Sequence, residues 1–137
     1  MKWQWKDYTI NNEKEKLDQN TIVNYILNES YWGKDRTESQ IKESIKNSLC
    51  FGLYKNSEMI GFARVITDYA VLYYLCDVFV LKEHRGKGLG KWLIETTINS
   101  PHLKNLKGFL NTKDAQDLYR KFGFKDAGNS AMVKTNN

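Results

Sequence analysis

The alternation of apolar and polar residues predicts the elements of the first half of the chain. Residues 3–10 alternate aromatic and polar side chains, which is the two-residue period of a strand. Apolar residues then recur at helical spacing and predict a first helix over residues 17–31. The run 37–40 has the form of a capping box and predicts the start of a second helix. The apolar face of this second helix is marked by Ile41, Ile45 and Leu49.

The middle of the chain is richer in strands. Strands are predicted at residues 51–54 and 60–66, and the polar turn between them favours a hairpin. Residues 71–81 are apolar on both faces, so this strand should lie centrally in a sheet that is covered on both sides. A third helix follows and ends before Pro101, because the residue before a proline favours extended backbone. A short strand is then expected at 108–112.

The C-terminal region predicts one more helix and one or two last strands. Asp114 is expected to cap this fourth helix, and Gly123 is expected to end it. Its apolar face follows helical spacing at Ala115, Leu118, Tyr119 and Phe122. The last strands are expected from Phe124 onward, through Met132 and Val133. The element order predicts an α/β fold of mixed α+β character, with a mixed central sheet flanked by about four helices in a single domain, 1–137.

Composition narrows the class of protein. Apolar residues make up 41% of the 137 residues and charged residues 27%, which is ordinary for a globular domain. No apolar run approaches the roughly 20 residues of a membrane-spanning helix. The N-terminus also lacks the apolar core of a signal peptide. We therefore expect a cytoplasmic protein with no membrane partner.

Charge and cysteine usage point to an anionic ligand and not to a metal. The formal net charge is +5, and the cations concentrate at residues 82–91, which favours an anionic cofactor over nucleic acid as the explanation. Cys50 and Cys76 lie in apolar, strand-like contexts that are typical of small buried residues. With two histidines and no clustered cysteines, the chain lacks the usual zinc-ligand spacing, so no metal is expected.

The stretch 84–91, His-Arg-Gly-Lys-Gly-Leu-Gly-Lys, is the clearest candidate for ligand binding. It follows an apolar strand and precedes a helical pattern. A helix start offers unpaired backbone N–H groups and partial positive charge, and glycines let that backbone approach a ligand closely. With the cations Arg85, Lys87 and Lys91 added, this arrangement is typical of a phosphate or pyrophosphate site. The plainer alternative is a solvated, glycine-rich turn.

The spacing argues against two common phosphate-binding motifs. A nucleotide P-loop requires four residues between its glycines and then Lys and Ser or Thr, whereas Trp92 follows Lys91 here. The dinucleotide fingerprint would require glycine at position 91 and belongs to an early βαβ unit, whereas this loop lies late in the chain.

Two segments resemble the GNAT superfamily of acyl-CoA-dependent N-acyltransferases. Residues 85–90, Arg-Gly-Lys-Gly-Leu-Gly, are similar to motif A of the family, R/Q-x-x-G-x-G/A. Residues 115–124 resemble its C-terminal pattern A-x-x-L-Y-x-x-x-G-F at every specified position. Many members carry Asn three residues before the Ala of that pattern, and this chain has Thr112 there, with Asn111 beside it. The resemblance extends over almost the whole chain and implies the GNAT fold.

The resemblance also implies a cosubstrate and an acceptor. It implies transfer of an acetyl group from acetyl-CoA to a primary amine on a small molecule or a protein, by a monomer or homodimer. The backbone of Val78, Phe79 and Val80 would pair with the pantetheine arm as an added strand would. The residues expected to hold the pyrophosphate or lie against the cofactor are Arg85, Gly86, Lys87, Gly88, Leu89, Gly90, Lys91 and Asn111.

The chemistry requires two proton transfers. An amine of pKa about 10.4 is almost entirely protonated at neutral pH and must lose a proton before it attacks, while the leaving thiolate must gain one. In the family a Tyr on the last helix is the acid, and Tyr119 matches its position. The alternative is that Tyr119 is only a core residue, although a tyrosine can both pack and donate.

The base is less well specified by the sequence. Asp77 is the candidate, because burial of a carboxyl group in an apolar strand suits it to accept a proton. The alternative is a buried carboxylate that is hydrogen-bonded for structure. Asp68 and Glu83 are rival bases that we expect on solvated turns.

The acceptor site and the overall function leave alternatives open. By resemblance, Tyr31 and Trp32 would form a wall of the acceptor site, with Tyr73, Tyr74 and Arg64 as further candidates. Alternatively, Tyr31 and Trp32 would simply cap the core.

A non-catalytic acyl-CoA-binding sensor of the same fold is the alternative function. Tyr119 argues against it, because a protein that only binds acyl-CoA needs no phenol there. A nucleic-acid-binding module would need a basic helix face with interleaved aromatics, which the sequence lacks, so no nucleic-acid partner is expected.

Overall fold

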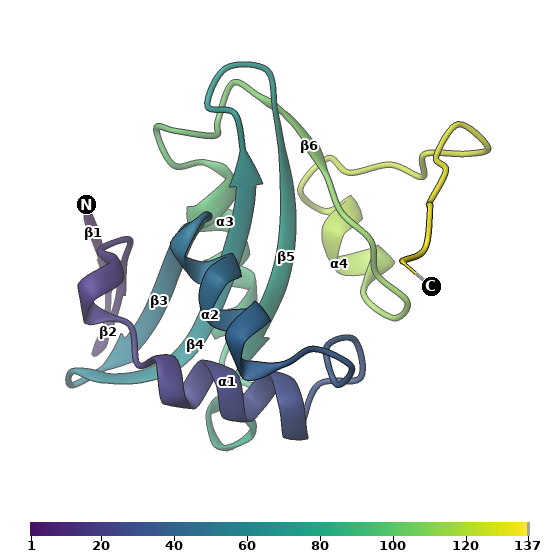
Figure 1. Cartoon of the computed structure of the whole chain (residues 1–137). Coiled ribbons are helices and arrows are strands. Elements are labelled where there is room, and N and C mark those ends of the chain that lie inside the picture. The colour runs from purple at the N-terminus through teal and green to yellow at the C-terminus, as the bar shows by residue number, and fades with distance from the viewer. Residues whose placement is uncertain (137) are drawn as a thin grey trace.

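A six-stranded sheet forms the centre of the computed structural model, which describes residues 1–136 (Figure 1). The strands lie across the sheet in chain order: β1 (Lys2–Trp5), β2 (Tyr8–Asn11), β3 (Leu49–Lys55), β4 (Glu58–Thr67), β5 (Leu72–Val80) and β6 (Lys107–Phe109). Neighbouring strands pair antiparallel except β5 and β6, which are parallel. This is the mixed sheet that the sequence predicts.

Helices cover both faces of the sheet (Figure 1). The helices are α1 (Gln19–Asn28), α2 (Glu38–Lys46), α3 (Leu89–Ile98) and α4 (Gln116–Arg120), with short 3₁₀ turns η1 (Lys14–Lys16) and η2 (Lys82–His84). One core cluster packs α1 and α2 on the sheet through residues such as Ile22, Ile41 and Phe79. The other packs α3 on the opposite face through Leu89 and Leu93. Residues of β5 therefore pack against both layers, as predicted. The predicted central position is wrong, because β5 is the fifth of six strands and β6 pairs with only its first three residues.

Both N-terminal helices begin at side-chain caps. Asp18 accepts a hydrogen bond from the backbone N–H of Thr21 at 3.1 Å before α1. The predicted capping box is confirmed before α2, because Thr37 Oγ1 accepts from Gln40 N at 3.1 Å and Gln40 Oε1 accepts from Thr37 N at 2.9 Å.

Two expectations about the N-terminal half are wrong. The single strand over residues 3–10 is a hairpin, β1 and β2, which turns at Lys6 with a φ of 54° and pairs Trp5 with Tyr8. Two adjacent polar residues, Lys6 and Asp7, interrupt the alternation and mark this turn. Leu49, expected on the face of α2, instead begins β3, because the helix ends at Lys46.

The C-terminal region also differs from expectation. Asp114 does not cap α4, since the residue before the helix is Ala115, whose N–H donates to Thr112 Oγ1 at 3.1 Å. Gly123 ends the helical region as predicted, with a φ of 94°. Residues 124–136 contain no strand, and Met132 and Val133 are exposed. This coil stands away from the sheet in Figure 1, so its short apolar pair has nothing to pack against.

A bulge in β5 changes which side chains face which layer. Phe62 pairs with Phe79 and Arg64 pairs with Cys76, so two residues, Asp77 and Val78, lie opposite one on β4. Asp77 has a φ of 51°, in the left-handed region. As a result, the side chain of Asp77 turns to the face that carries α1 and α2, where it meets Arg36.

Strands β5 and β6 separate beyond a short paired segment. β6 pairs with β5 only over the residues from Leu72 to Tyr74. From Leu75 onward, the edge of β5 that continues past β6 has no neighbouring strand among the described residues. No helix within this described part of the chain is long and apolar enough to cross a membrane.

Candidate active site

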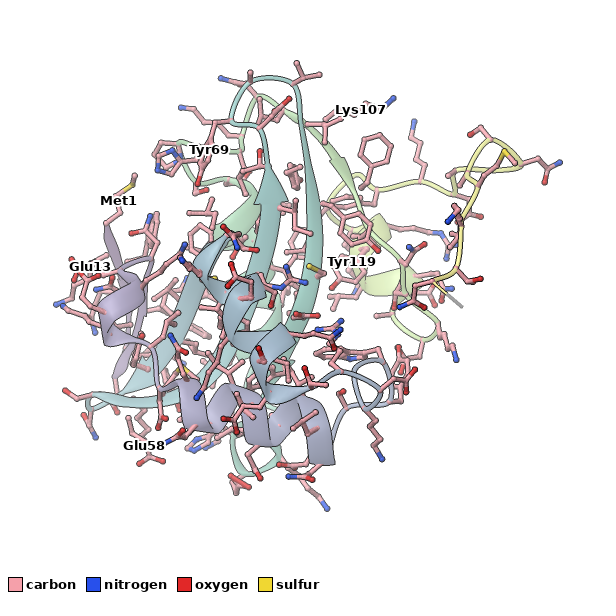
Figure 2. The ribbon with its side chains drawn as sticks, in the orientation of Figure 1. Met1, Glu13, Glu58, Tyr69, Lys107 and Tyr119 are labelled. Atoms are coloured by element: carbon pink, nitrogen blue, oxygen red, sulfur yellow. The ribbon has the colours of Figure 1, made fainter. Side chains whose placement is uncertain are left out.

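A cavity of about 970 Å³ lies where β5 and β6 separate. Residues 84–90 form one end, which we call the phosphate end after its predicted role. Residues 29–36, from the loop between α1 and α2, and residues 110–119, which lead into α4, form the other, the acceptor end. The unpaired part of β5 connects the two ends. Figure 2 shows Tyr119 in the space between β5 and α4.

The phosphate end is the start of α3. Gly88 precedes the helix with a φ of 81°, a conformation that residues with a Cβ rarely adopt. No side chain caps α3, so the first N–H groups, which lack partners within a helix, are open to a ligand. Of the predicted cofactor residues in this loop, five line the cavity: Arg85, Gly86, Gly88, Leu89 and Gly90.

The cations of the loop have different roles. Arg85 is oriented by two hydrogen bonds, from Nε to the carbonyl of Val80 at 2.9 Å and from Nη2 to the hydroxyl of Tyr25 at 2.8 Å. Lys87 and Lys91 are exposed and do not line the cavity, so they add positive charge around it without bordering it. His84 does line it, and its Nδ1 is buried without a hydrogen-bond partner among the described residues.

The floor of the cavity is the unpaired edge of β5. Val78, Phe79 and Val80 all line the cavity, and their pairing with a pantetheine arm stays a prediction. An exposed strand edge offers a row of backbone donors and acceptors, which an extended ligand with amide groups can pair with. Cys76 also borders the cavity as a free thiol, and burial raises its pKa to about 12.

Tyr119 brings a phenol to the acceptor end. It lines the cavity, and its ring packs edge-on against Phe124 with the centroids 5.9 Å apart. Burial, followed by the nearby groups of Tyr31 and Asp114, raises the pKa of Tyr119 to about 12. The phenol is therefore protonated at neutral pH, which suits it to donate a proton and not to accept one.

Asp77 is buried and paired with two arginines. Its Oδ2 accepts from Arg36 Nη1 at 2.8 Å and from Arg64 Nε at 2.7 Å, and only 2% of its side chain is exposed. Arg64 in turn donates from Nη1 to Ser48 Oγ at 3.0 Å. Although burial disfavours the charge of Arg64, the Asp77 carboxylate raises the pKa of its guanidinium above the ordinary value. These hydrogen bonds are what we expect if Asp77 is a buried carboxylate with a structural role and not the catalytic base.

The acceptor end joins segments that are far apart in the sequence. Tyr31 and Trp32 both line the cavity, and the Tyr31 hydroxyl lies 3.4 Å from Asp114 Oδ1 as a long hydrogen bond. Asn111 lines it too and donates from Nδ2 to the hydroxyl of Tyr74 at 2.8 Å.

Tyr73 does not line this cavity, contrary to expectation. Its side chain is 5% exposed, packs in the cluster on the α3 side and borders a separate cavity of about 410 Å³ with Leu103 and Gly108. Side chains alternate between the faces of a strand, so Tyr74 faces the acceptor end and Tyr73 faces away from it. Arg64 also lies outside the lining and reaches the site through Asp77.

Four charged residues of the acceptor end were not predicted as site residues. They are Glu29, Arg36, Lys113 and Asp114. No spacing in the sequence relates Arg36 to Asp77, because only the bulge and the loop after α1 bring them together. In residues 1–136, no group of three or more His, Cys, Asp or Glu side chains is placed to hold a metal ion.

Comparisons with known proteins agree with this geometry. A family model described as "Acetyltransferase (GNAT) domain" matches residues 46–126. A relative from Gibberella zeae, "Putative acetyltransferase FG08082", is 29% identical over 148 residues, covering 90% of this chain and 82% of that protein. A crystal structure of a "putative acetyltransferase belonging to the gnat family" from Xanthomonas campestris pv. campestris has a TM-score of 0.89 and 36% identity, covering 93% of this chain and 92% of the other.

A more distant structure shares the fold. The "predicted acetyltransferase with acetyl-CoA" from Clostridium acetobutylicum has a TM-score of 0.64 and 14% identity over 93% of this chain and 94% of its own, which shows the shared fold. GNAT acetyltransferases use acetyl-CoA as cosubstrate and act on amine acceptors. The family match over more than half of the residues identifies the chain as a member of the GNAT superfamily and an acyltransferase.

Proposed function

We propose that this enzyme transfers the acetyl group of acetyl-CoA directly to a primary amine, with Tyr119 as the proton donor to the leaving thiolate. The proposal rests mainly on the position of Tyr119. Tyr119 lines the same cavity as the glycine loop and the unpaired edge of β5. A cofactor with its pyrophosphate at the start of α3 and its pantetheine arm along β5 would extend toward the acceptor end, where the phenol lies.

The reaction forms one bond and breaks another. The unprotonated amine attacks the thioester carbonyl, so that a C–N bond forms, the C–S bond breaks and coenzyme A leaves as a thiolate. The thiolate takes the phenolic proton of Tyr119, which recovers a proton from solvent. With a pKa of about 12, the phenol is a weaker acid than a thiol near 8.5, so proton transfer to the thiolate is unfavourable by itself. Burial of the sulfur in the partly dry cavity and a hydrogen bond from the phenol to the developing thiolate would offset part of this cost.

The state of Cys76 favours direct attack over an acyl-enzyme. A cysteine nucleophile reacts as its thiolate, and a pKa of about 12 leaves very little thiolate at neutral pH. Cys76→Ala should therefore keep the activity of the parent enzyme. Loss of turnover in this variant, with acetyl-CoA binding retained, would instead indicate a covalent intermediate.

The proton of the acceptor amine needs a separate route. Asp77 stays a candidate base, but its Oδ2 is held by hydrogen bonds from Arg36 and Arg64, and its other oxygen, Oδ1, is buried without a partner among the described residues. We therefore favour the structural role for Asp77 and proton loss to water in the cavity. The nature of the acceptor, a monomeric or dimeric state and a cytoplasmic location stay predictions from the sequence.

The direct test is release of free thiol. The purified enzyme is incubated with acetyl-CoA and a panel of primary amines, and coenzyme A is measured with a thiol reagent. We expect acceptor-dependent release that Tyr119→Phe slows strongly. Tight acetyl-CoA binding without release for any amine would contradict the proposal and favour a sensor.

A further inference from the structure

Arg36 presents an oriented guanidinium at the acceptor end. It lines the cavity, donates from Nη1 to Asp77 at 2.8 Å, and lies 5.4 Å from the ring centroid of Trp32. Its Nε and Nη2 make no hydrogen bond within residues 1–136, and neither atom is buried. The side chain is 30% exposed. Two N–H-bearing nitrogens of a fixed, half-buried cation thus remain free to bind a ligand.

The charges around Arg36 do not balance. Arg36 and Arg64 share the single carboxylate of Asp77, and no other acidic group forms an ion pair with either of them in the described part of the chain. Half-buried charge is costly unless it is paired. A ligand carboxylate bound to Arg36 would balance the charges, giving two cations (Arg36 and Arg64) and two anions (Asp77 and the ligand). The planar guanidinium also matches the geometry of a carboxylate better than that of any other common anion except phosphate.

The position of Arg36 limits the size of the acceptor. Asp77, which Arg36 contacts, directly precedes Val78 on the strand edge expected to hold the pantetheine arm. A group bound to Arg36 therefore lies close to the place where the thioester would be attacked. The anionic group and the reacting amine must then be only a few bonds apart.

We propose that Arg36 binds a carboxylate of the acceptor, so that the enzyme acetylates the amine of a small amino acid. This inference rests on the acetyl transfer proposed above and specifies its substrate class. Arg36 is a binding residue in this account, and Asp77 and Trp32 hold its guanidinium in place.

Acidic residues at the opening of the cavity suggest a different acceptor, a polyamine, and the experiment must distinguish it from an amino acid. Glu29 and Asp114 line the cavity and would suit a polyamine. Both are exposed, and Asp114 is already near the Tyr31 hydroxyl. Attraction by exposed carboxylates is weakened by water and salt, whereas Arg36 is oriented and partly shielded.

The experiment compares matched acceptors in one assay. Glycine and phenylalanine are each compared with their primary amides, which lack only the carboxylate charge, and spermidine is added as a polyamine. Rates of thiol release are expressed per unprotonated amine, because the amide lowers the pKa of its neighbouring amine. We expect kcat/KM to favour the carboxylates. Arg36→Gln should reduce this acid-to-amide ratio about tenfold or more.

Arg64→Gln is the control, because it removes the other partner of Asp77 but does not line the cavity. The ratio should fall much less in Arg64→Gln than in Arg36→Gln, because Arg64→Gln lowers the positive charge around Asp77 but leaves the guanidinium that would contact the ligand. A ratio within one protein is insensitive to the fraction that is folded. A preference for amides or spermidine, or an equal fall of the ratio in both variants, would overturn the assignment of Arg36 while leaving acetyl transfer intact. Absence of thiol release with every amine would overturn the proposed function itself, and this inference with it.

Discussion

The two ends of the cavity are built in different ways. The phosphate end comes from consecutive residues, 84–90, at one strand-to-helix junction. The acceptor end is assembled from the loop after α1, the bulge of β5 and the segment leading into α4, and its key contact joins Arg36 to Asp77 across 41 positions. A site made of neighbouring residues can be shared by a whole family, whereas a site made of separate loops can vary with the acceptor.

The largest effect, a loss of acetyl-CoA binding, is expected from a substitution at the phosphate end. Gly88→Glu should abolish acetyl-CoA binding, because it places a side chain and a negative charge at a residue that lines the cavity with a φ of 81°. Gly128→Glu is the control: Gly128 has a φ of 68°, has open space for a Cβ and lies outside the cavity. Calorimetry should detect binding in the control only. Unchanged affinity in a folded Gly88→Glu protein would contradict the loop assignment.

At the acceptor end, Tyr119→Phe should reduce kcat by about 10²-fold and leave the KM for acetyl-CoA within a factor of about two. The ring still packs against Phe124, so the variant removes only the proton donor. Tyr74→Phe is a matched control, since it removes another cavity hydroxyl that accepts from Asn111. If both variants keep full activity, Tyr119 is a packing residue.

Asp77→Asn tests how the bulge and the acceptor end are joined. Asn tolerates the left-handed backbone at this position, so the change isolates the charge. Loss of the buried carboxylate beside two arginines should lower the free energy of unfolding by about 3 kcal/mol, measured by urea denaturation. If Asp77 is also the base, kcat should fall by more than the loss of folded protein explains, and the pH profile of kcat should lose its acidic limb.

Alkaline pH should weaken the fold. Burial raises the pKa of Cys50 to about 11 and those of Cys76, Tyr54 and Tyr119 to about 12, from ordinary values of 9.0 for the thiols and 10.0 for the phenols. Between about pH 9 and 12 the folded chain therefore holds more protons than the unfolded chain, and its stability falls as pH rises. Thermal unfolding at several pH values should show this decline, less steeply in Tyr119→Phe. A melting temperature that is constant up to pH 11 would contradict it.

The smallest effect on stability is expected for a residue that lies outside both ends of the cavity. Met132 is 94% exposed in the coil that follows α4, so Met132→Ser should change the free energy of unfolding by less than about 0.5 kcal/mol. A larger loss would indicate that this segment packs as the predicted last strand. The measurement is the same urea titration.

Local patterns account for most of what the sequence predicted correctly. The capping box before α2, the apolar strand β5 and the glycine loop before α3 each depend on neighbouring residues. Tyr119 was predicted from a short motif and lines the cavity, while its role as the acid stays a prediction.

The failures share a physical reason, because each depends on contacts that the local sequence does not encode. The bulge at Asp77 shifts the alternation of side chains within an apolar strand that shows no irregular spacing. Tyr73 was misplaced because either of two adjacent tyrosines could face the site. Arg36 lies in a loop and gains its role only from the partner that folding brings to it.

The most direct test of this account is a calorimetric titration of the enzyme with acetyl-CoA, beside coenzyme A and NAD. The account predicts saturable binding of acetyl-CoA and coenzyme A to one site per chain, and no binding of NAD. Failure to bind either form of coenzyme A, by a protein shown to be folded, would contradict the assignment of the cavity.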